Sequence, residues 1–355
     1  MIHSIAGRQR GYTLIELLIA LTLGAFLIGG ILQLYLGSKR SYNAQQAAIE
    51  LQEIGRFSLN ALVSDVRMAG FLACGQSTNI VNTLSSSANW LYDAANPVIG
   101  YEGGASTFPA AFSGAAVAGT DAIKISRAIP DDSYVVNTHA PATGTLTLKD
   151  PHDIAQNEIM VITDCLNSAL FQTTNAGVGT NVIKNSNAGG TVGNCTRGLG
   201  APLDCSSAGG TPYQFKENAF LMRYETNAFY IGVGASGRNA LFRISLDNDG
   251  TIGTAVEMAD GIADMQLVYG IDTSGDGSVD AYRTADAIGT AAWPSVVSVQ
   301  VNLLTESNID RVSDTSNSYV LFDGSAASLN AVTPTDRRLR RVFSSTVNIR
   351  NRTIP

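Results

Sequence analysis

The chain has 355 residues, of which 45% are hydrophobic and 15% are charged. This is the composition of a globular protein, long enough for a membrane anchor plus one large domain or two small ones. The 30 Asp and Glu residues outnumber the 23 Lys and Arg residues, for a net charge of −7. Because neutralising phosphates takes clustered Lys and Arg, this balance excludes general nucleic-acid affinity, and we predict no direct nucleic-acid binding.

The first predicted element is an apolar helix over residues 12–36. Residues 17–36 read LLIALTLGAFLIGGILQLYL, in which only Thr22 and Gln33 are clearly polar. Twenty such residues form a helix of about 30 Å, the thickness of the hydrocarbon layer of a bilayer. The basic stub before the run would stay cytoplasmic by the positive-inside rule. The rest of the chain is therefore expected on the periplasmic or outer side.

A carboxylate, Glu16, stands at the start of this apolar run. The string RGYTLIEL at residues 10–17 resembles the processing site of type IV prepilins, although that family usually has Phe in the place of Tyr12. The resemblance implies that a prepilin peptidase removes a leader peptide, residues 1–11, by cutting after Gly11. It also implies N-methylation of the new terminus at Tyr12.

Cleavage would give Glu16 a partner. A carboxylate in lipid costs a few kcal/mol unless it is paired. The new amine of Tyr12 in one subunit can meet Glu16 of a neighbour in a filament, because two opposite charges buried together cost far less than either alone. Such a pair would also set the axial register of the subunits. The alternative is that Glu16 lies near the membrane interface and stays hydrated.

Residues 37–73 predict an amphipathic continuation of the helix that ends near Gly70 and the Cys74-Gly75 step. Its string RFSLNALVSDVRMAGFLACG, residues 56–75, resembles the minor pilins called PilW. The apolar residues fall at spacings of three and four, which predicts one face docked on a β-rich domain. They are Leu51, Ile54, Phe57, Ala61, Leu62, Val66 and Ala69.

Residues 74–355 predict a head of short strands separated by turns, so the fold class is α+β, with the long helix packed on an antiparallel sheet. Further strings resemble PilW: GTDAIKISRA, VITDC, GIADMQLVYGIDTSGDGSVDAY and RRLRRVFSSTVNIRNR. The Gly- and Asn-rich region at about 174–212 is weakly covered by this resemblance. The predicted strands are 122–127, 145–149, 158–164, 219–224, 228–233, 240–246, 262–269, 294–304 and 342–350.

The four cysteines, an even number beyond a membrane anchor, predict two disulfides in an oxidising compartment. Cys195 and Cys205 bracket a short loop whose closure would contribute about 3 kcal/mol, which leaves Cys74 to join Cys165. The sequence leaves the other two connectivities open. It contains no CxxC pair and only three histidines, so the ligand spacing of a zinc site is absent.

The acidic loop at residues 272–280, DTSGDGSVD, has the D-x-S-x-D-G layout in which alternate oxygen-bearing side chains bind Ca²⁺. No cofactor is required, but the loop is a candidate for weak Ca²⁺ binding, since Arg283 stands where a bidentate glutamate would be expected. The alternative is an acidic β-turn between two strands. The candidate ligands are Asp272, Ser274, Asp276, Ser278 and Asp280.

No catalytic motif is present: the sequence has no G-x-S-x-G, no H-E-x-x-H and no phosphate-binding glycine loop. We expect His139 and His152 to be solvated in polar loops rather than catalytic. The basic cluster at residues 337–341 is interpreted as a solvated strand edge. Its alternatives are a contact with an acidic neighbour in a filament or with DNA.

These features together predict a structural protein, not an enzyme. The resemblance implies a minor pilin held first in the inner membrane, with a cytoplasmic amino terminus and a periplasmic head, and then assembled into the pilus at the cell surface. It implies partners that include other minor pilins, the major pilin, the prepilin peptidase and methylase, membrane lipid and a tip adhesin. The implied role is in a tip or priming complex that supports twitching motility, adhesion or DNA uptake. The alternatives are a type II secretion pseudopilin and a membrane-anchored periplasmic enzyme or receptor.

Overall fold

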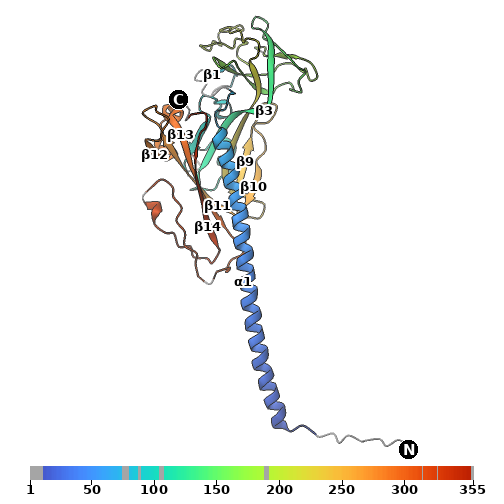
Figure 1. The fold of residues 1–355 in the computed structure, drawn as a ribbon, viewed down its shortest axis with the longest axis vertical. Coiled ribbons are helices and arrows are strands. Elements are labelled where there is room, and N and C mark those ends of the chain that lie inside the picture. The colour runs from blue at the N-terminus through green and yellow to red at the C-terminus, as the bar shows by residue number, and fades with distance from the viewer. Residues whose placement is uncertain are drawn as a thin grey trace, which may run out of the picture.

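The computed structural model describes residues 11–73, 80–86, 89–103, 108–187, 192–313, 315–325 and 327–352. Its longest element is the helix α1, Leu14–Met68, which runs unbroken for 55 residues. In Figure 1 the first half of α1 stands clear of the rest of the chain, and its second half lies against a β-rich head. The helix contains no proline, so nothing in its sequence forces a kink.

The larger sheet of the head has ten strands, and its main path runs β1-β6-β5-β8-β3-β4-β7. Strand β2 branches from β3, and β9 branches from β8 and carries β10. All its pairs are antiparallel except that of β1 with β6. The strands are β1 Ile80–Asn82, β2 Val98–Tyr101, β3 Ala122–Ala140, β4 Thr145–Leu148, β5 Ile159–Thr163, β6 Ser168–Gln172, β7 Val182–Lys184, β8 Phe220–Val233, β9 Asn239–Ser245 and β10 Val256–Asp260.

The smaller sheet has four antiparallel strands in the order β12-β11-β13-β14. They are β11 Ile262–Ile271, β12 Ala281–Arg283, β13 Val296–Glu306 and β14 Arg340–Asn348. The short helices of the head are η1 Trp90–Tyr92, α2 Ala110–Ser113, η2 Ala285–Ala287, η3 Thr290–Ser295 and η4 Ala327–Leu329.

Two long strands, β3 and β8, run the length of the large sheet side by side. Their first register covers 123–128 against 224–229, and after a shift 133–135 pairs with 220–222. One end of this pair carries β2, β9 and β10, and the other carries β4, β5, β6 and β7. The head therefore has two lobes joined by continuous strands, as the ribbon in Figure 1 shows.

The main core lies between α1 and the two sheets. Leu62 and Val66 of α1 pack with Ile231 of β8, Val301 of β13 and Val347 of β14, and all five are buried. The predicted docking of the apolar helix face is confirmed, with one correction. Phe57 was placed on that face and is exposed, because the buried stripe is centred on Leu51, Ser58 and Leu62.

A buried polar network fixes the end of α1 to the large sheet. Arg127 lies 3.4 Å from one oxygen of Asp65, and the Asn227 side chain donates to the other at 3.0 Å. Burial raises the pKa of Asp65, and the positive charge of Arg127 opposes that rise. Gly70 follows the helix with a φ of 69°, a left-handed conformation that glycine adopts without a steric cost.

Asparagine side chains complete strand pairing in the predicted Gly- and Asn-rich region. Asn175 donates to the Val182 carbonyl at 2.8 Å and accepts from the Lys184 N–H at 2.7 Å, which satisfies the outer edge of β7. Asn194 exchanges the same two kinds of bond with the backbone of Gln172. The described part of this region is therefore fixed to the sheet by amide side chains, which make the backbone hydrogen bonds that a neighbouring strand would otherwise make.

Candidate functional site

The amino terminus of α1 is closed by a hydrogen-bonded cap. Thr13 is the N-cap residue, and its hydroxyl accepts from the Glu16 N–H at 3.3 Å. The Glu16 carboxylate reaches back, and its Oε2 accepts from the Thr13 N–H at 2.9 Å and from the Thr13 hydroxyl at 3.0 Å. This reciprocal arrangement is a capping box, which satisfies backbone donors that the first turn of a helix leaves free.

The capping box explains why a carboxylate stands at the start of an apolar helix even before any neighbour is present. The spacing Thr13-x-x-Glu16 is a known signature of a helix start, so this role of Glu16 is additional to the one predicted from the sequence. Both of these contacts of the carboxylate use Oε2, so Oε1 can serve a second partner. Tyr12, whose amine would be that partner in another subunit, is 90% exposed.

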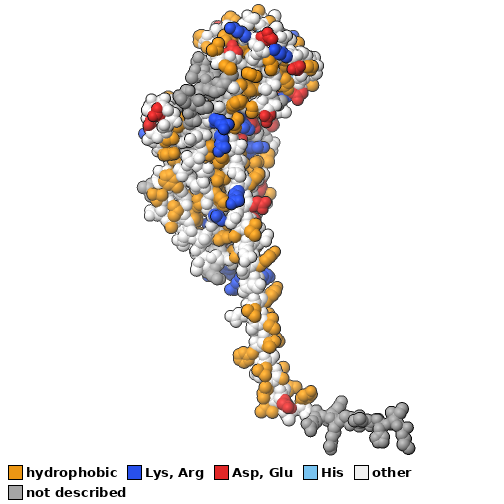
Figure 2. All heavy atoms as spheres, viewed as in Figure 1, with side chains coloured by type: hydrophobic (Ala, Val, Ile, Leu, Met, Phe, Trp, Pro, Cys, Tyr) orange, Lys and Arg blue, Asp and Glu red, His pale blue; other side chains and the backbone are white. Residues whose placement is uncertain are grey.

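The first half of α1 presents apolar side chains to its surroundings on all sides. Its large apolar residues, from Leu14 to Leu36, are each more than half exposed. In Figure 2 this half appears as a shaft dominated by hydrophobic side chains. Of the described helices, α1 is the one that is long and apolar enough to cross a membrane, and its most apolar part is not buried. A surface of this kind needs lipid or other protein around it.

One predicted disulfide is described in full. Cys195 and Cys205 are bonded, with their Cα atoms 5.2 Å apart, and close a ten-residue separation as expected. Cys165 is also disulfide-bonded. Its predicted partner, Cys74, lies outside the described residues, so that pairing stays a prediction.

The acidic loop after β11 is held by its own backbone. Asp272 accepts from the N–H groups of Gly275 at 2.6 Å and Gly277 at 2.8 Å, and Asp280 accepts from those of Thr273 and Ser274. The bond from Gly277 lowers the pKa of Asp272, and the hydroxyl and N–H of Thr273 lower the pKa of Asp280. Among the described residues, no three His, Cys, Asp or Glu side chains lie together as a metal site would require. Calcium binding by Asp272, Ser274, Asp276, Ser278 and Asp280 stays a prediction.

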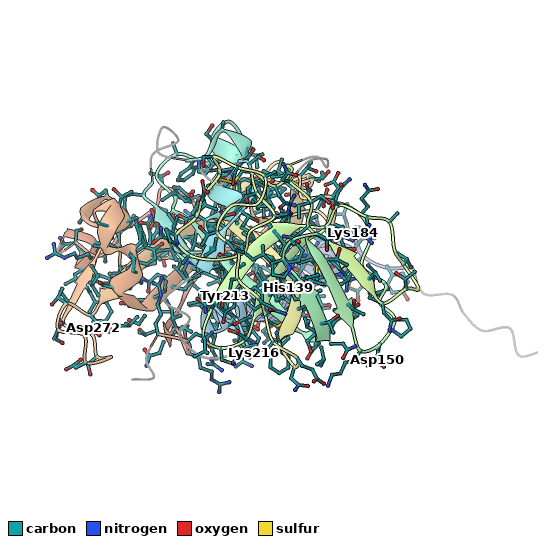
Figure 3. All side chains as sticks on the ribbon, turned by 90° about the horizontal axis from the view of Figure 1, so that it is seen from above. His139, Asp150, Lys184, Tyr213, Lys216 and Asp272 are labelled. Carbon is teal, nitrogen blue, oxygen red and sulfur yellow. A yellow bond between two sulfur atoms is a disulfide. The ribbon has the colours of Figure 1, made fainter. Side chains whose placement is uncertain are left out.

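The two histidines of the head are buried, so our expectation that they are solvated is wrong. His139 lies at the end of β3, where its Nδ1 accepts from the Phe215 N–H at 3.2 Å and burial lowers its pKa to about 4. His152 packs edge-on against Tyr134, with Nε2 at 3.3 Å from the Val182 carbonyl oxygen. Figure 3 shows His139 among the strands of one lobe and Asp272 at the far side of the head. Neither histidine lies beside the acidic loop.

The predicted basic cluster divides into two kinds of residue. Arg340 is only 9% exposed and pairs with Asp336 at 2.5 Å and Glu306 at 3.0 Å, which lowers the pKa of Asp336 to about 2. Arg338 donates to the Ser307 carbonyl at 2.7 Å. Arg337 and Arg341 are exposed. The interpretation as a solvated strand edge is therefore right for the exposed pair and wrong for Arg338 and Arg340, which fasten the start of β14.

Known protein families match this chain at its amino-terminal end and in its carboxyl-terminal third. Residues 7–32 match the prokaryotic N-terminal methylation motif. Residues 228–351 match the family described as Type IV Pilus-assembly protein W, and this match runs from the second half of β8 through β14. The carboxyl-terminal third of the chain is thus similar to PilW, and its amino terminus carries the methylation motif. The second match contains two of the strings that resembled PilW in the sequence, and the three strings before residue 228 lie outside it.

A search of solved structures found a similar protein, and a search of curated proteins found none. A type IV-like pilin from Thermus thermophilus aligns over 86% of this chain and 95% of its own, with 12% sequence identity and a TM-score of 0.33. No curated protein matches the chain. The likeness of this chain to type IV pilins thus rests on the methylation motif and the PilW match.

Proposed function

We propose that this protein is a minor pilin, first held in the inner membrane by residues 12–36 and later packed by the same surface in the pilus. The exposed apolar half of α1 is the observation that carries this proposal, because one surface suits both lipid tails and the apolar helices of other pilins. The amino terminus would face the cytoplasm and the head the periplasm. The Cys195–Cys205 disulfide agrees with a head in an oxidising compartment.

The proposed maturation follows from the amino-terminal motif. A prepilin peptidase cuts after Gly11, and the new terminus at Tyr12 is N-methylated. The amine of Tyr12 then pairs with the Glu16 carboxylate of a neighbouring subunit. Glu16 can cap its own helix and pair with a neighbour at once, because its cap uses a single carboxylate oxygen.

The proposed role is structural. The head joins other minor pilins and the major pilin in a complex at the pilus tip that primes assembly and carries an adhesin. Twitching motility, adhesion or DNA uptake would follow from the pilus as a whole. The described head supports a structural role rather than catalysis, because its buried histidines are held by packing and backbone contacts.

Mass spectrometry of sheared surface filaments from the native host tests this proposal. We expect an amino-terminal peptide that starts at N-methylated Tyr12 in the filament fraction. A mature peptide found solely in the inner membrane would favour a pseudopilin or an assembly platform. Uncut chain that retains Met1 in every fraction would overturn the proposed maturation and leave Glu16 as a helix cap alone.

A further inference from the structure

The strands at the edges of the two sheets are protected in every described case but one. Strands β1, β7 and β12 have three residues each, and β2 has four. The outer edge of β7 is also bonded by Asn175. Strand β10 has a bulge between Glu257 and Ala259 and carries charged side chains. Short length, bulges and charge are the usual means by which proteins prevent an edge from pairing with another chain.

Strand β14 has none of these protections over most of its length. It pairs with β13 over nine residues without a register shift. Residues 342–348 read VFSSTVN, with no charge and no proline. This stretch is about 20 Å long and rich in β-branched and small polar residues, which suits strand pairing.

The direction of each backbone group in β14 follows from its register. The Ile349 N–H donates to the Val297 carbonyl at 2.8 Å, so the odd-numbered residues bond to β13. The even-numbered residues therefore direct their N–H and C=O groups outward. The ends are closed, because the Arg340 N–H donates to Asn317 Oδ1 and the Arg350 N–H to the Arg67 carbonyl.

Between those closed ends lie four outward-facing residues, here called the open edge: Val342, Ser344, Thr346 and Asn348. No described residue forms a backbone hydrogen bond to their outward groups. Ser344, Thr346 and Asn348 are exposed, and α1 contacts the outward edge through the Arg67 carbonyl, which accepts from the Arg350 N–H beyond the open edge. Each of the four offers one donor and one acceptor to an incoming strand.

Four exposed arginines border the open edge, and we call them the basic flank: Arg56, Arg67, Arg341 and Arg350. Arg341 stacks on Phe343, 5.5 Å from the ring centroid, and that ring fills the space above Gly55, next to Arg56. Arg350 is joined to Arg67 by its backbone. Among the described residues none of these four arginines has a carboxylate partner. Figure 2 shows Lys and Arg side chains spaced along this part of the molecule.

We propose that the open edge of β14 binds an extended segment of a different protein chain, and that this segment carries carboxylates on both sides of its pairing residues. Backbone hydrogen bonds along Val342–Asn348 would give the affinity, as in other cases of strand addition. The basic flank selects the charge of the partner. A second copy of this chain is disfavoured as the occupant, because two such edges would bring their basic flanks together.

The test uses the full chain in detergent micelles and a synthetic peptide of alternating Thr and Val with Glu at both ends. A peptide with Lys at both ends is the matched probe. Hydrogen exchange should show fast amides at Val342, Ser344, Thr346 and Asn348 in the free chain. The Glu-ended peptide should slow them roughly tenfold, and the Lys-ended peptide should not.

Two variants separate the contribution of the backbone hydrogen bonds from that of the basic flank. Thr346→Pro removes one outward N–H, so it should lower the affinity for the Glu-ended peptide roughly tenfold relative to Thr346→Ala. The variant should still fold, because proline is tolerated at the outer side of an edge strand. The double change Arg341→Glu and Arg350→Glu should reverse the preference between the two peptides. The circular dichroism of each variant should match that of the parent chain.

The proposal is overturned if the four amides are already slow in the free chain or if the Glu-ended peptide leaves them unchanged. Equal affinity for Thr346→Pro and Thr346→Ala would exclude strand addition. Equal affinity of both peptides would exclude selection by the basic flank. None of these results depends on incorporation into a pilus, so they are separate from the test of the proposed function.

Discussion

Glu16 caps its own helix and is proposed to pair with the Tyr12 amine of a neighbouring subunit. A single substitution can separate these two roles. Glutamine also completes a capping box, so Glu16→Gln keeps the helix start and loses the charge, whereas Glu16→Ala loses both. If the carboxylate pairs with a neighbouring amine, both variants should insert in the membrane, and both should be absent from sheared filaments. Immunoblots of membrane and filament fractions give the measurement. Normal incorporation of Glu16→Gln would show that the cap alone is needed.

The Phe343 ring occupies the space above Gly55, so the close approach of α1 to β14 depends on this glycine. A Cβ at Gly55 would overlap the ring. We expect Gly55→Ala to lower the free energy of unfolding of the head by about 1–3 kcal/mol, because the overlap exceeds the gain in helix propensity. Urea denaturation in micelles measures this loss.

Gly37→Ala is the control for that experiment, because no atom lies within 4 Å of a Cβ at Gly37. It should leave the unfolding of the head unchanged. Phe343→Leu combined with Gly55→Ala should recover part of the stability. A loss of equal size in both glycine variants would mean that the contact with Phe343 is not the cause.

His139 makes the stability of the head depend on pH. Its folded pKa of about 4 lies below the ordinary value of 6.5, so the folded head favours the neutral ring. The contribution is full above pH 6.5 and is lost as the pH falls toward 4. Between pH 7 and about pH 4.5 the parent chain should lose on the order of 2 kcal/mol more than His139→Gln, whose amide oxygen can still accept from Phe215. Urea denaturation at the two pH values gives the comparison, and equal losses would refute the argument.

The acidic loop of residues 272–280 is held together by hydrogen bonds from its own backbone to its carboxylates. Its Asp272 and Asp280 carboxylates already accept backbone N–H groups, so Ca²⁺ would have to compete with these bonds. We expect binding only in the millimolar range. Isothermal titration of the full chain in micelles tests this, with Asp276→Asn as the control that keeps the oxygen accepting from Ser278. An absence of heat up to about 10 mM Ca²⁺ would end the prediction.

The elements also differ in how much of them could be predicted from the sequence. Helix α1 was predictable to within a few residues, since its apolar run and its 3.6-residue period are local signals. The two strands predicted at 219–224 and 228–233 are a single strand, β8, because Glu225 and Asn227 sit on buried polar contacts that interrupt the apolar pattern. Local pattern cannot show that a polar residue has a partner far away in the chain.

Short strands and buried polar groups were missed for the same reason. Strand β7 has three residues, and the side chain of Asn175 satisfies its outer edge. Lys124 is completely buried, and its ammonium donates to two carbonyls and the Ser126 hydroxyl, which no spacing in the sequence indicates. In the candidate site, the motif around Glu16 was recognisable. The open edge of β14 could not be recognised from the sequence, because it depends on the order of the strands in the folded sheet.

The two halves of α1 have different surroundings. The first half is exposed and apolar, and the second half packs against the head. The first buried residue of α1 is Ala47, and the buried positions that follow continue to Val66. Residues before Ala47 add apolar surface that the head does not use. The head should therefore be stable without them, because its core is built from the second half of α1 and the two sheets.

A chain that starts at residue 38 tests this division. It should be soluble without detergent and should unfold within a few degrees of the full chain in micelles, since every buried residue of α1 is kept. A chain that starts at residue 60 is the matched control. It lacks Ala47, Leu51, Gly55 and Ser58, and it should lose several kcal/mol through the exposed apolar surface of β13 and β14. Thermal unfolding followed by circular dichroism distinguishes the two chains. Equal destabilisation of both would mean that the membrane half of α1 supports the head directly, and the helix would then not be divisible in this way.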